Sequence, residues 1–351
     1  MKKYDKEVLE ALLSDEKDVM KALEKNYVKA LAGIKQKIKI LLAEAEITQL
    51  QSKIYQLQYQ QALERQISNY LNVLQTGNVK TIDEYLQRCY EDAFVGNIYS
   101  LQKQDIPLAF PVDQTQMLNS VTKSTDGFNF SKRLYNNTAA LQQVVKAEII
   151  RGIASNLSYS DIARNISNYS EADMNKAKRI ARTEGHRVQN EAKMDSMNTA
   201  KSKGANIVKQ WDSTLDGKTR PEHGQLDGQI RELDEDFTVG GYSAKCPGGF
   251  GDPYMDCNCR CTVLQRARWA LGMAETRYLG RTENMTDDQL TPIAGKLHIS
   301  VDELRKYGGQ IIPIRASNYE DFRKQYDNIW NYQGSDFQKE VEARMASYKK
   351  K

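Results

Sequence analysis

The stretch between residues 216 and 261 concentrates side chains that can bind a metal ion. It contains four of the five cysteines, Cys246, Cys257, Cys259 and Cys261, and one of the three histidines, His223. Thiolates and a neutral imidazole are the ligands that zinc prefers, and four of them close a tetrahedral structural site. The cluster therefore predicts either a structural zinc ion that cross-links a small domain or a reactive metal centre.

The spacing of the cysteines bears on which of them share an ion. In an extended segment, side chains at i, i+2 and i+4 point to one side, so Cys257, Cys259 and Cys261 would all face one metal on a strand, whereas a turn would leave only two of them. Cys246 precedes a Pro-Gly-Gly turn that can present a thiolate. We expect His223, Cys259 and Cys261 to be ligands, with Cys246 or Cys257 as the fourth. The alternative is a set of reduced, buried thiols beside a hydrogen-bonded histidine.

A catalytic metal would also need an open coordination position and a nearby general base. Asp216, Glu222 and Asp227 are the candidates by proximity in sequence. They lie in turn-like segments, where acidic residues are common because they form local hydrogen bonds. We therefore expect no enzymatic activity, and the alternative function is a metal-dependent hydrolase or nuclease.

A second constellation consists of basic side chains on a predicted helix over Ala172–Lys203. These residues are Lys176, Lys178, Arg179, Arg182 and Arg187. Such a face could contact DNA phosphates. The alternative is an ion-paired helix surface that packs on the cysteine-containing segment, because Glu184 can meet Arg187 at i+3. The formal net charge of +4 permits binding of nucleic acid but does not demand it.

The elements around these residues predict a mainly α protein with a small β-rich module, an α+β fold. Residues 4–75 lack proline, contain only Gly33 as glycine and are rich in helix formers. Apolar residues recur there at three- and four-residue steps: Ile47, Leu50, Ile54, Leu57, Leu63, Ile67, Leu71 and Leu74. This pattern predicts a long N-terminal helical arm, either one helix or a hairpin, that ends near Gly77 and precedes a helix over Thr81–Val95.

After residue 205 the apolar pattern changes from helical to extended. The expected strands are Asn206–Trp211, Gln229–Arg231, Phe237–Val239 and Cys261–Gln265. A small module of this kind buries little apolar surface, and its need for a cross-link is a separate argument for zinc. The expected domains are an arm (1–95), connecting loops with a helical body (96–204), a β-rich Cys/His module (205–266) and a mixed helical tail (267–351).

Further helices are expected around this module. They cover Ser131–Ala154, Asp161–Asn168 with a cap at Ser158, Tyr319–Trp330 and Ser335–Tyr348. The sequence has no apolar run long enough to span a membrane, and its first residues lack the features of a signal peptide. We expect a protein that matures in a cytoplasm with reduced cysteines and has no membrane partner.

An ordered series of motifs resembles a known family. The motifs are Arg182-Thr-Glu184, Trp211-Asp-Ser, Asp216-Gly-Lys-Thr-Arg220-Pro-Glu-His223, Leu226-Asp-Gly228, Pro247-Gly and Asn258-Cys-Arg-Cys261. In this order they resemble the phage Mu protein F-like family of minor head (head morphogenesis) proteins over residues 110–266. The family's histidine and Asn-Cys-Arg-Cys positions map to His223 and Asn258–Cys261, whereas Cys246 and Cys257 are not carried over.

The resemblance implies a minor capsid protein of a virion. Family members are packaged in small numbers inside the capsid during procapsid assembly and associate with the portal vertex, and some bind DNA and help its delivery. The implied partners are the portal protein, a major capsid or scaffold protein, and double-stranded DNA bound without sequence preference. The implied location is the host cytoplasm during assembly and then the capsid interior, with a role in genome ejection. Some relatives carry additional enzymatic or toxin domains, but residues after 270 show no catalytic signature.

Overall fold

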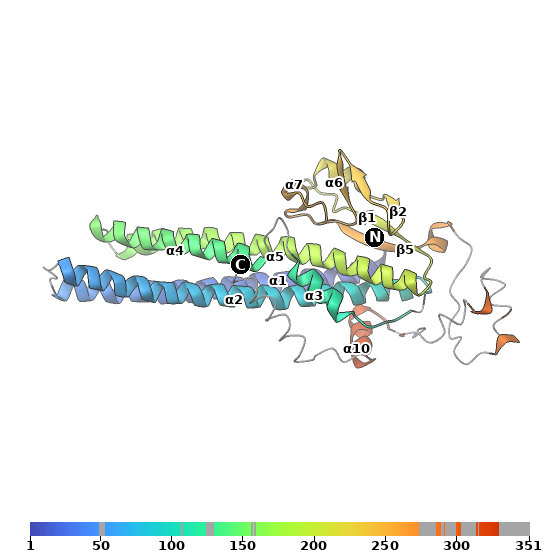
Figure 1. Ribbon diagram of the computed structural model, residues 1–351, viewed down its shortest axis with the longest axis horizontal. Helices are drawn as coiled ribbons and strands as arrows, with labels where there is room; N and C mark the ends of the chain where they lie inside the picture. Colours follow the sequence, from blue (N-terminus) through green and yellow to red (C-terminus); the bar gives the residue numbers. More distant parts are fainter. Residues whose placement is uncertain are drawn as a thin grey trace. The chain divides into compact units, whose positions relative to one another are not determined.

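The computed structural model describes residues 1–48, 53–106, 108–123, 130–155, 157, 159–273, 286–288, 291, 300–302, 314 and 316–329. The described chain is mainly helical with a small antiparallel sheet, as predicted (Figure 1). It divides into two compact units. Unit 1 comprises Met1–Asp15, Leu86–Lys123 and Thr183–Ser347, and unit 2 comprises Glu16–Tyr85, Ser124–Arg182 and Tyr348–Lys351.

The described residues form several helices of nine or more residues. They are α1 (Lys3–Thr48), α2 (Lys53–Gln102), α3 (Gln114–Thr122), α4 (Phe130–Ala154), α5 (Tyr159–Ser202) and α10 (Tyr319–Ile329). The two helices predicted over Asp161–Asn168 and Ala172–Lys203 are one helix, α5, because no proline or glycine interrupts residues 168–172. The predicted cap Ser158 and the predicted helix Ser335–Tyr348 lie outside the described residues.

In unit 2 the N-terminal arm is a hairpin of two helices. Asn26 of α1 donates a hydrogen bond of 3.2 Å to Asn78 of α2, and further along α1 Gly33 lies against Tyr70, so the two helices run antiparallel. The predicted stripe is buried at Ile67, Leu71 and Leu74. The other predicted members of the stripe, Ile47, Leu50, Ile54, Leu57 and Leu63, lie outside the described side chains.

The prediction that Gly77 ends a helix is wrong, because α2 continues through it to Gln102. An interior glycine costs a helix only about 1 kcal/mol relative to alanine. Packing of the helix against α1 outweighs this cost, since the side chain of Asn26 lies next to Gly77. The helix predicted over Thr81–Val95 is consequently the second half of α2.

At a second position of α2, close packing leaves no room for any residue larger than glycine. In unit 1, a Cβ atom on the buried Gly96 would lie 2.4 Å from Cγ1 and 3.3 Å from Cβ of Val8, a stiff β-branched side chain. We expect Gly96→Ala to lower the free energy of unfolding by about 1–3 kcal/mol. We expect Gly77→Ala, with its nearest contact at 3.5 Å, to raise it by up to about 1 kcal/mol. Urea titration measures both free energies of unfolding. Equal effects of the two substitutions would contradict the conclusion that close packing constrains Gly96 but not Gly77.

The sheet of unit 1 lies in the β module, which we define as residues 205–267. Strands β1 (Ile207–Asp212), β2 (Ile230–Arg231) and β5 (Thr262–Ala267) form an antiparallel sheet in the order β2-β1-β5. Strands β3 (Phe237–Val239) and β4 (Tyr242–Ala244) form a separate hairpin. The four predicted strands are confirmed as β1, β2, β3 and β5. Strand β4 was not predicted, although its turn residues Gly240 and Gly241 both have positive φ, as a two-residue hairpin requires.

A buried lysine holds the parts of the β module together. Lys209 lies on β1 and is fully buried. Its ammonium group donates hydrogen bonds to three backbone carbonyls, those of Leu233 at 3.2 Å, Glu235 at 2.6 Å and Lys245 at 2.8 Å. Burial lowers the pKa of Lys209 to about 8. These bonds connect β1 to the segments that flank the β3–β4 hairpin, and nothing in the sequence pattern indicated them.

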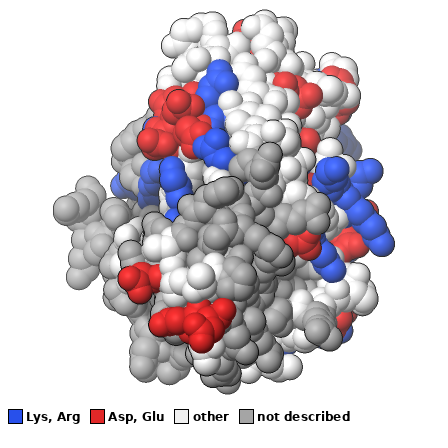
Figure 2. All heavy atoms as spheres, turned by 90° about the vertical axis from the view of Figure 1, so that its right-hand side faces the viewer, with Lys and Arg blue, Asp and Glu red and all other residues white. Residues whose placement is uncertain are grey.

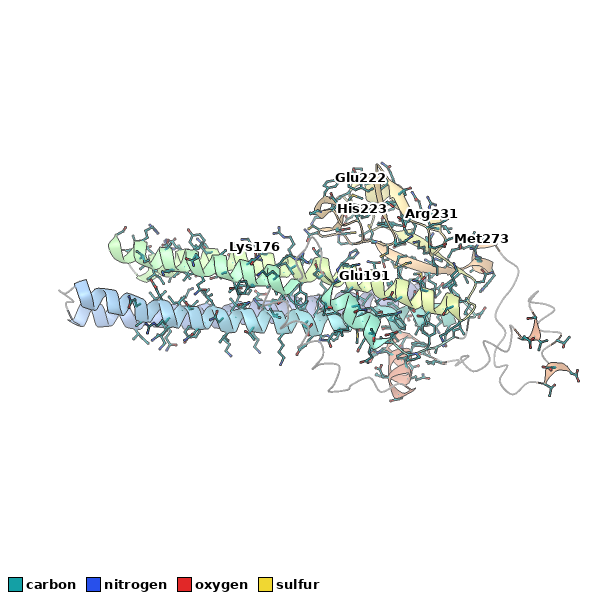
Figure 3. The ribbon with its side chains drawn as sticks, in the orientation of Figure 1. Lys176, Glu191, Glu222, His223, Arg231 and Met273 are labelled. Atoms are coloured by element: carbon teal, nitrogen blue, oxygen red, sulfur yellow. The ribbon has the colours of Figure 1, made fainter. Side chains whose placement is uncertain are left out.

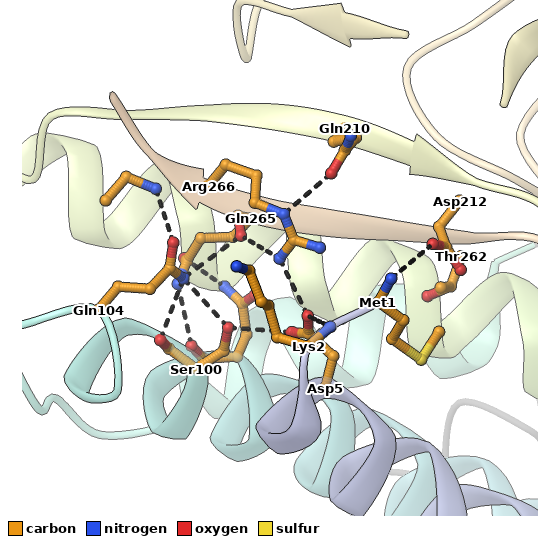
Figure 4. A network of polar contacts seen from close by, with 12 residues as sticks. Met1, Lys2, Asp5, Ser100, Gln104, Gln210, Asp212, Thr262, Gln265 and Arg266 are labelled. Carbon is orange, nitrogen blue, oxygen red and sulfur yellow. Dashed lines mark hydrogen bonds and ion pairs between the residues drawn. The ribbon is translucent and has the colours of Figure 1, made fainter. Parts of the chain in front are cut away.

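Strand β5 is buried along its whole length in unit 1 and ends in a polar network (Figure 4). Arg266 forms an ion pair of 3.0 Å with Asp5 of α1, and both side chains are buried. Asn97 of α2 donates a hydrogen bond of 2.9 Å to Gln265. Gln104 accepts one of 2.8 Å from the backbone of Ala267. The network therefore fixes the first turn of α1 and the end of α2 to the edge of the sheet.

Helix α10 confirms the prediction of a helix over Tyr319–Trp330 to within one residue. Its side chains pack in unit 1, where the ring of Phe322 lies 5.2 Å from that of Tyr99, centroid to centroid. The hydroxyl of Tyr326 donates a hydrogen bond of 2.9 Å to the carbonyl of Phe110. No helix within the described part of the chain is both long and apolar enough to cross a membrane.

Candidate metal centre

His223 lies on α6 (Pro221–Leu226), a short helix that was not predicted. The helix begins at Pro221, whose fixed φ suits the first helical position. His223 is 2 % exposed. Its backbone carbonyl accepts a hydrogen bond of 2.6 Å from Ser213, whose hydroxyl accepts one of 3.0 Å from the indole of Trp211. Figure 3 labels His223 and its half-buried neighbour Glu222 on this helix.

A turn, not a strand, separates the cysteines at positions 257 and 259. The backbone N–H of Cys259 donates to the carbonyl of Asp256, at the end of α7 (Pro253–Asp256), over 3.2 Å. Cys257 has φ −64° and ψ 127°, and Asn258 has φ 55°. These angles define a type II turn, whose third position favours glycine or asparagine. Of the two arrangements that the sequence left open, the structure therefore has the one with a turn.

The structure brings His223, Cys259 and Cys261 together. Nδ1 of His223 lies 3.2 Å from Sγ of Cys261 and 3.5 Å from Sγ of Cys259. All three ligand atoms lie within 4.8 Å of one another, and all three residues are buried. The metal–ligand bond lengths of a tetrahedral zinc site would place nitrogen and sulfur about 3.5 Å apart. The donor set and its spacing therefore fit a zinc ion.

Hydrogen bonding within the trio also suits a metal. The Cys261 thiol interacts with Cys259, and this hydrogen bond lowers the pKa of Cys259 and raises the pKa of Cys261 to about 12. Metal binding would displace such a proton, because zinc takes thiolates. The other ring nitrogen of His223, Nε2, is buried without a hydrogen-bond partner among the described residues. The polar contacts of the imidazole are thus directed at the two sulfurs.

The other two cysteines lie outside this trio. Cys246 follows β4 and is buried, and burial raises its pKa to about 12. Cys257 is partly exposed. Among the described histidine, cysteine and acidic residues, the group with ligand atoms within 4.8 Å contains neither of them. The prediction that one of them completes the site is not tested by this arrangement.

The three acidic residues considered as general bases have partners elsewhere. Asp216 accepts a hydrogen bond of 2.7 Å from Arg260, which holds the pKa of this carboxyl below its usual range. Asp227 accepts one of 2.7 Å from the backbone of Ser213, and Glu222 accepts one of 3.3 Å from Tyr254. Each carboxylate therefore has a structural role that does not require a reaction at the metal.

The predicted basic face of α5 is partly engaged in ion pairs. In unit 2, Lys176 and Arg179 are exposed, whereas Lys178 pairs with Glu24 at 3.5 Å and Arg182 pairs with Glu16 at 2.8 Å.

Arg187, which belongs to unit 1, is 4 % exposed. It donates to Glu184 at 2.9 Å, to Glu191 at 2.6 Å and to the carbonyl of Ser120 at 2.9 Å. Arg187 is therefore not available to DNA phosphates, and the ion-paired alternative holds for it.

Sequence reasoning missed one group of residues behind the trio. Nε2 of His186 on α5 lies 2.5 Å from the carbonyl of Cys261, and Asn190, one turn later, accepts a hydrogen bond of 2.8 Å from the backbone of Val263. Burial lowers the pKa of His186, so its neutral ring donates to this carbonyl. The i, i+4 spacing of two polar residues was the available signal. These bonds position the backbone that carries Cys261.

Comparison with known proteins supports the resemblance. Residues 143–264 match the family model described as phage Mu protein F like protein. Over 199 residues the chain is 30% identical to the minor head protein GP7 of Bacillus phage SPP1, a match that covers 56% of this chain and 63% of that protein. Residues 143–264 are thus similar to the phage Mu protein F-like family, and the relative from phage SPP1 is a minor head protein. The part of this Mu F-like chain that matches the family model contains His223 and all four cysteines of the cluster.

A second relative of this Mu F-like chain carries a different name. Over 241 residues the chain is 35% identical to the NAD(+)–arginine ADP-ribosyltransferase EFV of Enterococcus faecalis, and the match covers 68% of this chain and 49% of that protein. The chain thus spans about half of one curated relative and less than two thirds of the other. No solved structure matches the chain.

Proposed function

We propose that this Mu F-like chain is a minor head protein that acts in phage head morphogenesis and becomes part of the virion. The similarity to a minor head protein of phage SPP1 carries the proposal. In this role the chain is packaged inside the procapsid near the portal vertex. Its protein partners are the portal protein and a major capsid or scaffold protein.

The proposal includes double-stranded DNA as a partner, bound without sequence preference during packaging and genome ejection. Lys176 and Arg179 of α5 support it, because both side chains are exposed. On the face that Figure 2 presents, basic and acidic side chains are interspersed among uncharged ones. Contacts between a few exposed cations and DNA phosphates give weak, salt-dependent binding, which is typical of binding without sequence preference.

The proposal also includes a structural zinc ion held by His223, Cys259 and Cys261. The burial of all three residues and the fit of their spacing support it. A zinc ion there would cross-link α6 to the segment that leads into β5. It would supply the β module with stability that its small apolar core cannot provide alone.

Phage heads assembled with and without this chain test the proposed role. We expect the chain to co-purify with procapsids or with portal protein, because a minor head protein is incorporated during assembly. We expect particles that lack it to be malformed or poorly infectious. Electron microscopy and plaque titres measure these outcomes, and normal particles with full infectivity in its absence would contradict the proposal.

A further inference from the structure

The trio of His223, Cys259 and Cys261 leaves one position of a tetrahedral site to be filled, and two oxygen-bearing side chains close to the two cysteines, those of Ser213 and Asp256, are already engaged. Ser213 donates its hydroxyl proton to the carbonyl of His223 and accepts from Trp211. The carboxylate of Asp256 accepts backbone hydrogen bonds from Phe250 at 3.2 Å and Gly251 at 2.8 Å. Recruiting either group would break the contacts that hold these loops. A cysteine is therefore the better candidate.

Cys246 is not free to reach the trio. It is 5 % exposed. Its backbone is fixed on both sides, because the carbonyl of Lys245 accepts from Lys209 and the carbonyl of Cys246 itself accepts a hydrogen bond of 3.2 Å from Gly249. The charges that act on its thiol come mainly from Glu191 and Lys209, not from the trio. Ligation by Cys246 would require this backbone to move.

Cys257 has the opposite properties. It occupies the second position of the type II turn, two residues before Cys259. Its carbonyl accepts a hydrogen bond of 2.6 Å from Arg220, the residue that precedes the helix carrying His223. Its backbone is thus fixed next to both elements of the trio. Its partly exposed thiol has no hydrogen bond among the described residues, and a change of χ1 rotamer would move Sγ by about 3 Å.

The turn at Asn258 leaves Cys257 outside the trio, and we propose that rotation about its χ1 brings its thiolate in as the fourth ligand and closes a Cys₃His structural zinc site. This inference rests on the zinc ion of the proposed function. Three thiolates, a neutral imidazole and Zn²⁺ carry a net charge of −1. Arg220 and Arg260 lie beside the cysteines that would bear this charge. The thiol protons pass to solvent when the ion binds.

Titration of the full chain with Co²⁺ and Zn²⁺ tests the assignment, with Cys257→Ser compared with Cys246→Ser. We expect Cys257→Ser to lower the thiolate-to-cobalt charge-transfer absorbance by about a third, because one of three sulfur ligands is lost. We expect it to weaken Zn²⁺ affinity by at least about tenfold, the lower end of what even outer-shell substitutions cost. Cys246→Ser should change neither quantity.

Alkylation of the unmodified chain gives a readout that does not depend on folding of a variant. We expect iodoacetamide to modify Cys257 in the presence of a chelator and not in the presence of Zn²⁺, whereas the buried Cys246 resists modification in both conditions. A chain that binds Zn²⁺ but shows no protection of Cys257, or that loses affinity in Cys246→Ser, would overturn the assignment and leave the zinc proposal intact. A chain that binds neither metal would overturn both and leave the proposed role in the head untouched.

Discussion

Replacement of Asp5 by alanine is expected to lower the free energy of unfolding by about 3–5 kcal/mol. The carboxylate of Asp5 and the guanidinium of Arg266 form an ion pair of 3.0 Å, with side chains that are 4% and 7% exposed. Asp5→Ala would leave the charge of Arg266 buried without this partner. The cost arises from that uncompensated charge more than from the loss of the attraction itself.

Urea unfolding followed by tryptophan fluorescence measures this effect, because Trp211 is buried in the same unit. Asp18→Ala is the matched control, since Asp18 pairs with Lys21 at 3.4 Å on the surface, with side chains 66% and 77% exposed. We expect this control to change stability by less than about 0.5 kcal/mol. The double variant Asp5→Ala/Arg266→Met should recover much of the loss. Equal effects of Asp5→Ala and Asp18→Ala would contradict the role of the buried pair.

Lys193 is expected to make stability depend on pH in alkaline solution. Its side chain is buried in unit 1, where Nζ donates a hydrogen bond of 2.6 Å to Thr262. Burial lowers the pKa of Lys193 from 10.5 to about 8, against the opposing effect of Asp5 and Asp212. Below pH 8 the amine is charged in both states, so the full cost of burying it is present. Between pH 8 and 10.5 only the unfolded chain keeps the proton, so this cost is relieved as pH rises.

The measurement is the difference in unfolding free energy between the unmodified chain and Lys193→Met, taken at several pH values from 7 to 10.5. We expect the difference to move in favour of the unmodified chain as pH rises, by at most about 3 kcal/mol. Other titrating groups cancel in this difference. A difference that does not change with pH, or one that moves towards the variant, would show that Lys193 is not buried as a charged group near neutrality.

The strands and the grouping of His223, Cys259 and Cys261 could be predicted from the sequence because their signals are local. Short runs that contain β-branched or aromatic residues, set between segments rich in glycine, indicate β1 and β5. The chemistry of thiolates and imidazole singles out His223, Cys259 and Cys261. The turn at Asn258 could not be predicted, since asparagine is tolerated in a left-handed conformation but does not require it. Its presence decides whether Cys257 faces the same way as its neighbours.

The remaining differences have a common physical origin in long-range contacts. The passage of α2 through Gly77 depends on Asn26, which is distant in the sequence. A lysine is normally exposed, so the burial of Lys193 and Lys209 is visible only when their oxygen partners are known. The sequence likewise predicts Arg187 to be a surface cation, because its contacts with Glu191 and Ser120 become known only from the structure.

The carbonyl partners of Lys209 also bear on how the chain folds while it is synthesised. They follow Lys209 by 24, 26 and 36 residues, so the ribosome releases the ammonium group well before it releases the oxygens that receive it. Strand β5, which pairs with β1, is made later still. Burial of β1 before then would leave a charged amine without partners. We therefore expect the β module to remain open during translation and to close in one late step, after residue 267 has left the exit tunnel.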